Sequence, residues 1–197
     1  MEKHLIREIQ EELRIKLKGN RFEHTLGVQY TSVCLAMKYG CNLKKAELAG
    51  LLHDCAKQIA EKDMVELCEK YGEDISDFEY KHPFLLHGKA GACLAKMTYD
   101  IKDEEILNAI RNHTTGRENM SLLEQIVFVA DYIEPGRKEA KNLEFLRKMA
   151  FEDLDLATLK ILEQTLEYLE QTGASVDQRT VVTRDFYKEL LRSKVHE

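Results

Sequence analysis

Apolar residues recur at helical spacing along nearly the whole chain. Leu5, Ile9 and Leu13 mark one face of a first helix, which Gly19 and Asn20 should end. The same periodicity predicts further helices over about residues 22–40, 43–57, 62–71, 83–98, 103–112, 122–132, 139–150, 154–170 and 180–192. Strand-length runs of β-branched residues are scarce. The sequence therefore predicts an all-α protein.

Length and composition indicate a single domain. The chain has 197 residues, of which 44% are hydrophobic, and this is enough to bury a core. Short polar connections separate the predicted helices, and no linker divides them. We expect one domain over residues 1–197, with a core at about 20–135 and additional C-terminal helices at about 139–192. The helix near 154–169 is amphipathic and rich in Glu, which is typical of a packed outer helix.

The charge and hydropathy of the chain limit the classes of partner that we expect. A formal net charge of −6 argues against a nucleic-acid polymer as partner, because phosphate-backbone binding requires a basic surface. No apolar stretch approaches the roughly 20 residues needed to span a bilayer, and residues 1–20 lack the apolar region of a signal peptide. We therefore expect no membrane association and a cytoplasmic location. Five cysteines without a C-x-x-C pair are expected to be reduced core thiols.

Histidine and aspartate stand out against this helical background. Five of the seven histidines lie between residues 20 and 115. The pair His53 and Asp54 follows the apolar stretch 48–52, and Asp131 ends the apolar run 126–130. An ionised carboxylate in an apolar setting is costly unless it is paired or binds a cation. A divalent metal shared by these groups, with His24 joining from another helix, would offset both costs.

Each of these residues also has a simpler explanation. A single histidine is more often a hydrogen-bonded helix residue than a ligand, and Asp131 alone could cap the turn before Pro135. The order of these residues along the chain favours a shared metal site over the simpler explanations. A histidine near a helix start is followed about thirty residues later by a His-Asp pair, and an aspartate follows a late apolar helix.

Four longer segments carry a family resemblance. They are HTLGV at 24–28, HDCAK at 53–57, HTTG at 113–116 and ADYIEPGR at 130–137. Together they resemble the HD superfamily of metal-dependent phosphohydrolases and, within it, the YqeK subgroup of symmetrical bis(5′-nucleosyl)-tetraphosphatases. The resemblance covers about residues 20–170. It implies an HD-domain helical bundle that hydrolyses diadenosine tetraphosphate into two ADP, by attack of a metal-bound water on a phosphoanhydride phosphorus.

The resemblance also implies a metal centre at named positions. His24, His53, Asp54 and Asp131 would hold a first ion, Asp54 would bridge to a second, and His87 and His113 would complete the second site. The expected cofactors are two divalent ions, with iron favoured and manganese or zinc as alternatives. His87 could instead be a buried hydrogen-bonded histidine, and His113 a C-terminal helix cap. His82 fits neither set and is expected in a loop.

Cations and hydroxyls near these positions are candidates for substrate contacts. Lys57 follows His53 by four residues, so on a helix it would share its face and reach a phosphate; the alternative is a surface lysine. Arg137 could grip a phosphate with its guanidinium. The expected substrate-binding set is Arg21, Lys57, His87, His113, Thr114 and Arg137, and the expected catalytic set is His53, Asp54 and Lys57. A helix-ending turn explains Thr114 equally well.

Three functions remain open from the sequence. The first is cleavage of a dinucleoside polyphosphate. The second is a different HD-type enzyme acting on a nucleoside monophosphate, a deoxynucleoside triphosphate or a cyclic dinucleotide. The third is a non-catalytic module that binds metal or nucleotide. The partner is a small nucleotide in each enzymatic case, and the sequence leaves open whether the chain forms a homodimer.

Overall fold

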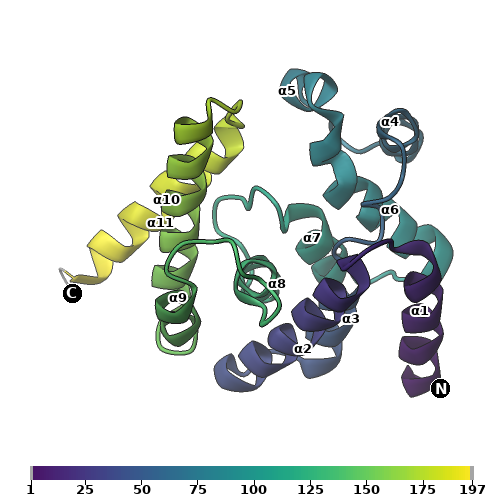
Figure 1. The fold of residues 1–197 in the computed structure, drawn as a ribbon, viewed down its shortest axis with the longest axis horizontal. Coiled ribbons are helices and arrows are strands. Elements are labelled where there is room, and N and C mark those ends of the chain that lie inside the picture. The colour runs from purple at the N-terminus through teal and green to yellow at the C-terminus, as the bar shows by residue number, and fades with distance from the viewer. Residues whose placement is uncertain (1, 196–197) are drawn as a thin grey trace.

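Helices make up the whole of the regular structure in the described part of the chain. The computed structural model describes residues 2–195, with side chains described from residue 5 to 194. The elements are α1 (Glu2–Lys16), α2 (Arg21–Tyr39), α3 (Leu43–Leu52), α4 (Glu61–Tyr71), α5 (Asp77–Lys81), the 3₁₀ helix η1 (Pro83–Leu86), α6 (His87–Tyr99), α7 (Glu104–Asn112), α8 (Leu122–Ile133), α9 (Leu143–Ala150), α10 (Leu154–Thr172) and α11 (Gln178–Val195), as Figure 1 shows. The all-α prediction is confirmed.

Helix α8 lies at the centre of the bundle. Leu123, Ile126 and Val129 are fully buried on it, and α2, α3, α7 and α10 pack around it. The capping box formed by Ser121 and Glu124 starts α8. This central position explains why residues 126–130 are apolar on every side of the helix. It also brings the last turn of α8, with Asp131, against α2.

Several helix boundaries differ from the prediction. The helix expected over 43–57 ends at Leu52, and three hydrogen bonds of the i to i−3 type fold the next residues into turns, from the N–H groups of Cys55, Lys57 and Ile59. The helix expected over 83–98 begins as η1 and continues as α6 from His87. Helix α5 was not predicted, because five residues held by a capping box are too short to show periodicity.

The C-terminal helices form a hairpin against the bundle. Helix α10 packs on α8, α9 and α11, and the hairpin of α10 and α11 lies at one end of the molecule in Figure 1. Arg179 of α11 donates a hydrogen bond to Asn112 at the end of α7, over 2.7 Å. The helix expected from residue 139 starts at Leu143, so residues 134–142 form a loop between α8 and α9.

A second, smaller apolar cluster supports the other side of the molecule. Met64 and Cys68 of α4 pack there against Leu86 and Ala90. All five cysteines are free, but the expectation that they are core thiols is wrong for two of them: Cys34 is exposed and Cys41 is half-buried. None of the described helices is long and apolar enough to cross a bilayer.

Candidate metal centre and adjoining cleft

Six predicted ligand side chains converge from different elements. His24 lies on the first turn of α2, Asp131 on the last turn of α8, and His87 opens α6. The remaining three are His53 and Asp54, in the turn after α3, and His113, which caps the end of α7. The structure therefore brings all six predicted positions together, although the His-Asp pair stands on a turn and not within a helix.

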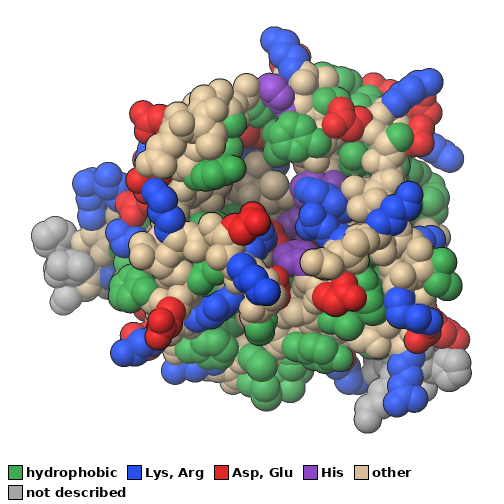
Figure 2. Space-filling model, viewed as in Figure 1, with side chains coloured by type: hydrophobic (Ala, Val, Ile, Leu, Met, Phe, Trp, Pro, Cys, Tyr) green, Lys and Arg blue, Asp and Glu red, His purple; other side chains and the backbone are tan. Residues whose placement is uncertain are grey.

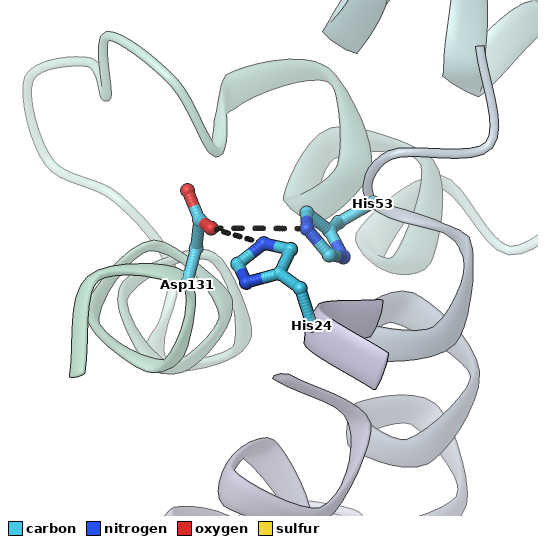
Figure 3. A group of neighbouring side chains, drawn as sticks. All are labelled: His24, His53 and Asp131. Atoms are coloured by element: carbon cyan, nitrogen blue, oxygen red, sulfur yellow. Dashed lines mark ion pairs between the residues drawn. The ribbon is translucent and has the colours of Figure 1, made fainter. Parts of the chain in front are cut away.

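His24, His53 and Asp131 form the first half of this cluster. The Oδ1 atom of Asp131 lies 3.0 Å from Nε2 of His24 and 3.8 Å from Nε2 of His53, as Figure 3 shows. Both imidazole rings present the same nitrogen to one carboxylate oxygen. The candidate ligand atoms of these three residues all lie within 4.8 Å of one another, which is compact enough for one ion.

Asp54 divides its two oxygens between two pairs of histidines. Its Oδ2 lies 3.6 Å from Nε2 of His53 and 4.0 Å from Nε2 of His24. Its Oδ1 lies 3.5 Å from Nε2 of His87 and 3.6 Å from Nε2 of His113. The carboxylate thus stands between the first pair of rings and the second. This is the geometry that a bridging ligand would need.

Each of the four histidines is oriented by its other ring nitrogen. The Nδ1 atoms lie against acceptors: Gly50 O at 2.7 Å for His53, Phe84 O at 2.7 Å for His87, Ile110 O at 2.8 Å for His113 and Glu134 Oε1 at 3.1 Å for His24. An acceptor at Nδ1 favours the tautomer with its proton there, which leaves the lone pair of Nε2 facing the cluster. The simpler explanations of His87 and His113 as hydrogen-bonded residues are therefore compatible with a ligand role.

The protonation states of His53, His87 and Asp54 suit a metal, whereas for His24 the effect of burial is outweighed by the carboxylates of Asp131 and Glu134, which raise its pKa above its usual value. Burial lowers the pKa of His53 to about 4, and burial together with His113 and Lys57 lowers the pKa of His87 to about 3. Burial raises the pKa of Asp54, but its histidine neighbours outweigh this and the pKa falls below its usual value. Neutral imidazoles and ionised carboxylates are the forms that bind metal.

Two buried nitrogens at the centre have no hydrogen-bond partner in the described part of the chain. These are Nε2 of His24 and Nε2 of His53, and the close approach of His24 to Asp131 does not have hydrogen-bond geometry. Unsatisfied buried polar atoms are rare in folded proteins and call for an explanation such as an ion. The donor set of imidazoles and carboxylates fits a divalent metal, and His24, His53, Asp54 and Asp131 would hold it.

Three predicted cations contact this cluster directly. Arg21 donates to Asp54 Oδ2 over 2.8 Å, and Arg137 donates to the backbone oxygen and to Oδ1 of Asp131 over 2.9 and 3.2 Å. Lys57 Nζ lies 3.2 Å from Nε2 of His87. Lys57 reaches this position from the turn after α3, so the helical i+4 argument for it is wrong. Burial lowers the pKa of Lys57, and the charges of Asp54 and Asp131 oppose that effect.

Thr114 also lies at the centre. Its hydroxyl oxygen is 3.1 Å from Nε2 of His87 and 3.3 Å from Nε2 of His113. Among the remaining predicted positions, His82 lies between α5 and η1, as expected, with its ring 4.5 Å from that of Phe78. No contact joins it to the cluster among the interactions found in residues 2–195.

A cleft of about 1380 Å³ leads away from His24. Its walls are the start of α2, the loop 134–141 and the last turns of α10. It carries the cations Lys18, Arg21, Arg137, Lys138 and Lys141, against the acids Glu23, Glu134 and Glu139. Figure 2 shows histidine side chains within a hollow on this face, with Lys and Arg side chains beside them. The cleft is therefore rich in cations and borders the cluster at His24.

Sequence reasoning missed two parts of this site. Helix α10 was expected to be only an outer helix, yet Gln164, Tyr168 and Thr172 line the cleft. Glu134 lies within the ADYIEPGR segment, but no role was predicted for it, because its burial cannot be seen in the sequence. The partner of Glu134, Nδ1 of His24, is 110 positions away in the chain and could not be inferred from spacing.

Known proteins share both the sequence and the fold. The family model described as HD domain matches residues 21–136. A protein of Halalkalibacterium halodurans named "Bis(5′-nucleosyl)-tetraphosphatase, symmetrical" is 40% identical over 89% of this chain and 91% of its own length. A Bacillus subtilis protein of the same name is 37% identical over 85% of this chain and 89% of its own.

A solved structure extends the similarity to three dimensions. It is described as a predicted HD superfamily hydrolase involved in NAD metabolism, from Clostridium acetobutylicum. It superposes with a TM-score of 0.89 and 42% sequence identity, covering 92% of this chain and 96% of its own.

Proposed function

Because this chain belongs to the HD domain family, and within it is similar over most of its length to symmetrical bis(5′-nucleosyl)-tetraphosphatases, we propose that it hydrolyses diadenosine tetraphosphate into two ADP. The observation that carries the proposal is the position of Asp54 between two pairs of histidines, one of which includes His24 of the cation-lined cleft. A polyphosphate chain is strongly anionic, so a cleft of this charge suits it.

The cluster supports a two-ion centre. His24, His53, Asp54 and Asp131 would hold one ion, while Asp54 with His87 and His113 would hold the other. When bound, such ions lower the pKa of a coordinated water and neutralise charge on the phosphoryl oxygens. Ligation rich in histidine favours iron, manganese or zinc over magnesium, and we propose iron as the cellular metal.

The protein's own cations then act on the phosphates. Arg21 and Arg137 each lie in the cleft and contact a cluster carboxylate, so either guanidinium could exchange that carboxylate for a phosphate oxygen. The Nε atom of Arg137 is buried and has no hydrogen-bond partner among the described residues, which leaves a donor available. Lys57 stands beside His87, where it could balance charge on the leaving group.

A different nucleotide substrate is the second candidate. The solved relative from Clostridium acetobutylicum is described as a hydrolase involved in NAD metabolism, and the same cluster could serve another phosphoanhydride or phosphoester. In that case the cluster would keep its role, and only the nucleotide bound in the cleft would be different. Product analysis distinguishes the two candidates.

The test is anaerobic purification with metal analysis, followed by incubation with diadenosine tetraphosphate and chromatography of the nucleotides. We expect ADP as the sole nucleotide product and about two iron or manganese ions per chain. The variant His53→Ala serves as the control for a contaminating hydrolase and should form no product. AMP together with ATP would overturn symmetrical cleavage. Absence of turnover in a fully metal-loaded protein would exclude diadenosine tetraphosphate as the substrate.

A further inference from the structure

One buried carboxylate beside the cluster belongs to none of the expected sets. Glu134 follows the last turn of α8, three residues after Asp131, and only 3% of its surface is exposed. A buried carboxylate must be compensated by partners. Oε1 lies 3.1 Å from Nδ1 of His24, and Oε2 accepts a hydrogen bond from the N–H of Gly136 over 2.5 Å. The two oxygens therefore join a candidate metal ligand to the turn that carries Arg137.

Two glycines make room for this carboxylate. A Cβ atom added at Gly27 would overlap Oε2 of Glu134 and lie 3.1 Å from its Cδ. A Cβ atom at Gly136 would lie 3.0 Å from the same oxygen. Neither glycine has a positive φ, so the backbone conformation does not require glycine at these positions. Gly27 is unfavourable within a helix, and the space taken by Glu134 explains its presence in α2.

Glu134 differs from the groups that orient the other histidines. His53, His87 and His113 each have a backbone carbonyl at Nδ1. A neutral carbonyl fixes the tautomer, whereas a carboxylate fixes it and also increases the electron density of the ring. Among the described residues, His24 is the cluster histidine with a carboxylate at this position.

We infer that Glu134 is a positioning residue: it holds His24 with its Nε2 lone pair facing the metal cluster and ties that histidine to the Gly136–Arg137 turn. The inference rests on the proposed metal centre but not on the identity of the substrate. Arg147 supports the same turn by donating to the backbone oxygen of Glu134 over 2.8 Å and to that of Arg137 over 3.1 Å.

The decisive variant is Glu134→Gln, which keeps the shape of the side chain. Its amide offers one acceptor oxygen, so it cannot accept from both His24 and Gly136, and its NH₂ group meets a donor instead. The measurement is titration of the metal-free protein with Co²⁺, by competition with a chelator, together with thermal unfolding of the metal-free protein. We expect Co²⁺ affinity to fall about 10- to 100-fold with little change in unfolding temperature. Glu152→Gln, an exposed carboxylate on the surface, is the matched control and should bind as the wild type.

A double-mutant cycle separates positioning from simple packing. Gly27→Ala should weaken Co²⁺ binding because its Cβ displaces the carboxylate of Glu134. In a Glu134→Ala background the overlap with the carboxylate is gone and only the Cβ of residue 134, 3.3 Å away, remains, so Gly27→Ala should then cost little further. Wild-type Co²⁺ affinity in Glu134→Gln, or additive effects of the two substitutions, would overturn the inference alone. Failure of the wild-type protein to bind Co²⁺ would overturn the metal centre as well.

Discussion

The six candidate metal ligands, here called the metal cluster, differ in burial from the cleft that leads away from His24, here called the outer cleft. In the cluster, His53, Asp54, His87 and His113 are at most 3% exposed, and backbone carbonyls fix the three histidine rings. In the outer cleft, side chains such as Lys138 and Tyr168 are exposed, and Tyr168 retains 65% of its surface. A rigid donor set therefore adjoins an adaptable surface.

This difference assigns separate tasks to the two regions. Metal-centred chemistry needs donor atoms held within a few tenths of an ångström, which packing in the core provides. The cleft, with its exposed side chains, is the surface that we propose for the nucleotide. Substitutions in the cluster should therefore change metal content and turnover together. Substitutions in the outer cleft should change substrate affinity with metal content intact.

The largest expected effect comes from Asp54→Ala. The substitution removes both oxygens that face the two histidine pairs, so neither half of the cluster stays complete. Loss of a partner outside the ligand set costs up to about 100-fold, and removal of a shared ligand should lower kcat/KM by more than that. Metal analysis and kinetics on the same preparation, with circular dichroism to verify folding, check this. A variant that keeps both its metal and its activity would remove Asp54 from the site.

Substitution of Arg137 tests the separation of the two regions, because this residue lines the outer cleft and contacts Asp131 of the metal cluster. Arg137→Ala removes a charged hydrogen-bond donor, and such bonds contribute about 1.5–3 kcal/mol, so kcat/KM should fall about 10- to 100-fold. Metal content should stay near that of the wild type, because the guanidinium contacts Asp131 without being a ligand. Arg137→Lys should recover little, since lysine cannot bind a phosphate with two parallel hydrogen bonds.

Arg184→Ala, which removes a half-buried arginine of α11 outside the cleft, is the matched control for the loss of an arginine. An unchanged kcat/KM in Arg137→Ala would exclude a phosphate contact. A large loss of metal would move Arg137 from the cleft to the cluster.

The sequence predicted the cluster far better than the cleft, for a physical reason. A carboxylate directly after an apolar run, such as Asp131, is anomalous, and the anomaly is visible without a structure. The helical class followed from periodicity, and the predicted ranges 22–40 and 103–112 match α2 and α7 to within one residue at each end. The end of α3 could not be predicted, because the apolar pattern of the residues after Leu52 fits a continued helix as well as the turns that the structure shows.

Contacts between distant segments were not predictable in this way. The role of Glu134 depends on a histidine from another helix, and the part that α10 takes in the cleft depends on how the C-terminal hairpin packs on α8. Polar residues such as Gln164 on an amphipathic helix have the same pattern whether they face solvent or a substrate. Only the folded arrangement separates these two cases.

Tyr168 should give the smallest effect and the sharpest test of the outer cleft. Its ring is exposed on the last turns of α10, and stacking of a base on an aromatic side chain contributes about 1–3 kcal/mol. For an exposed ring we expect the lower end, so Tyr168→Ala should raise KM for diadenosine tetraphosphate about 5-fold with little change in kcat. Tyr168→Phe should behave as the wild type because it keeps the aromatic face. Tyr30→Ala, an exposed tyrosine on α2 outside the cleft, should leave KM unchanged. Equal KM values for Tyr168→Ala and the wild type would place the nucleosides away from α10. The proposed nucleotide-binding surface of the outer cleft would then be limited to the loop 134–141.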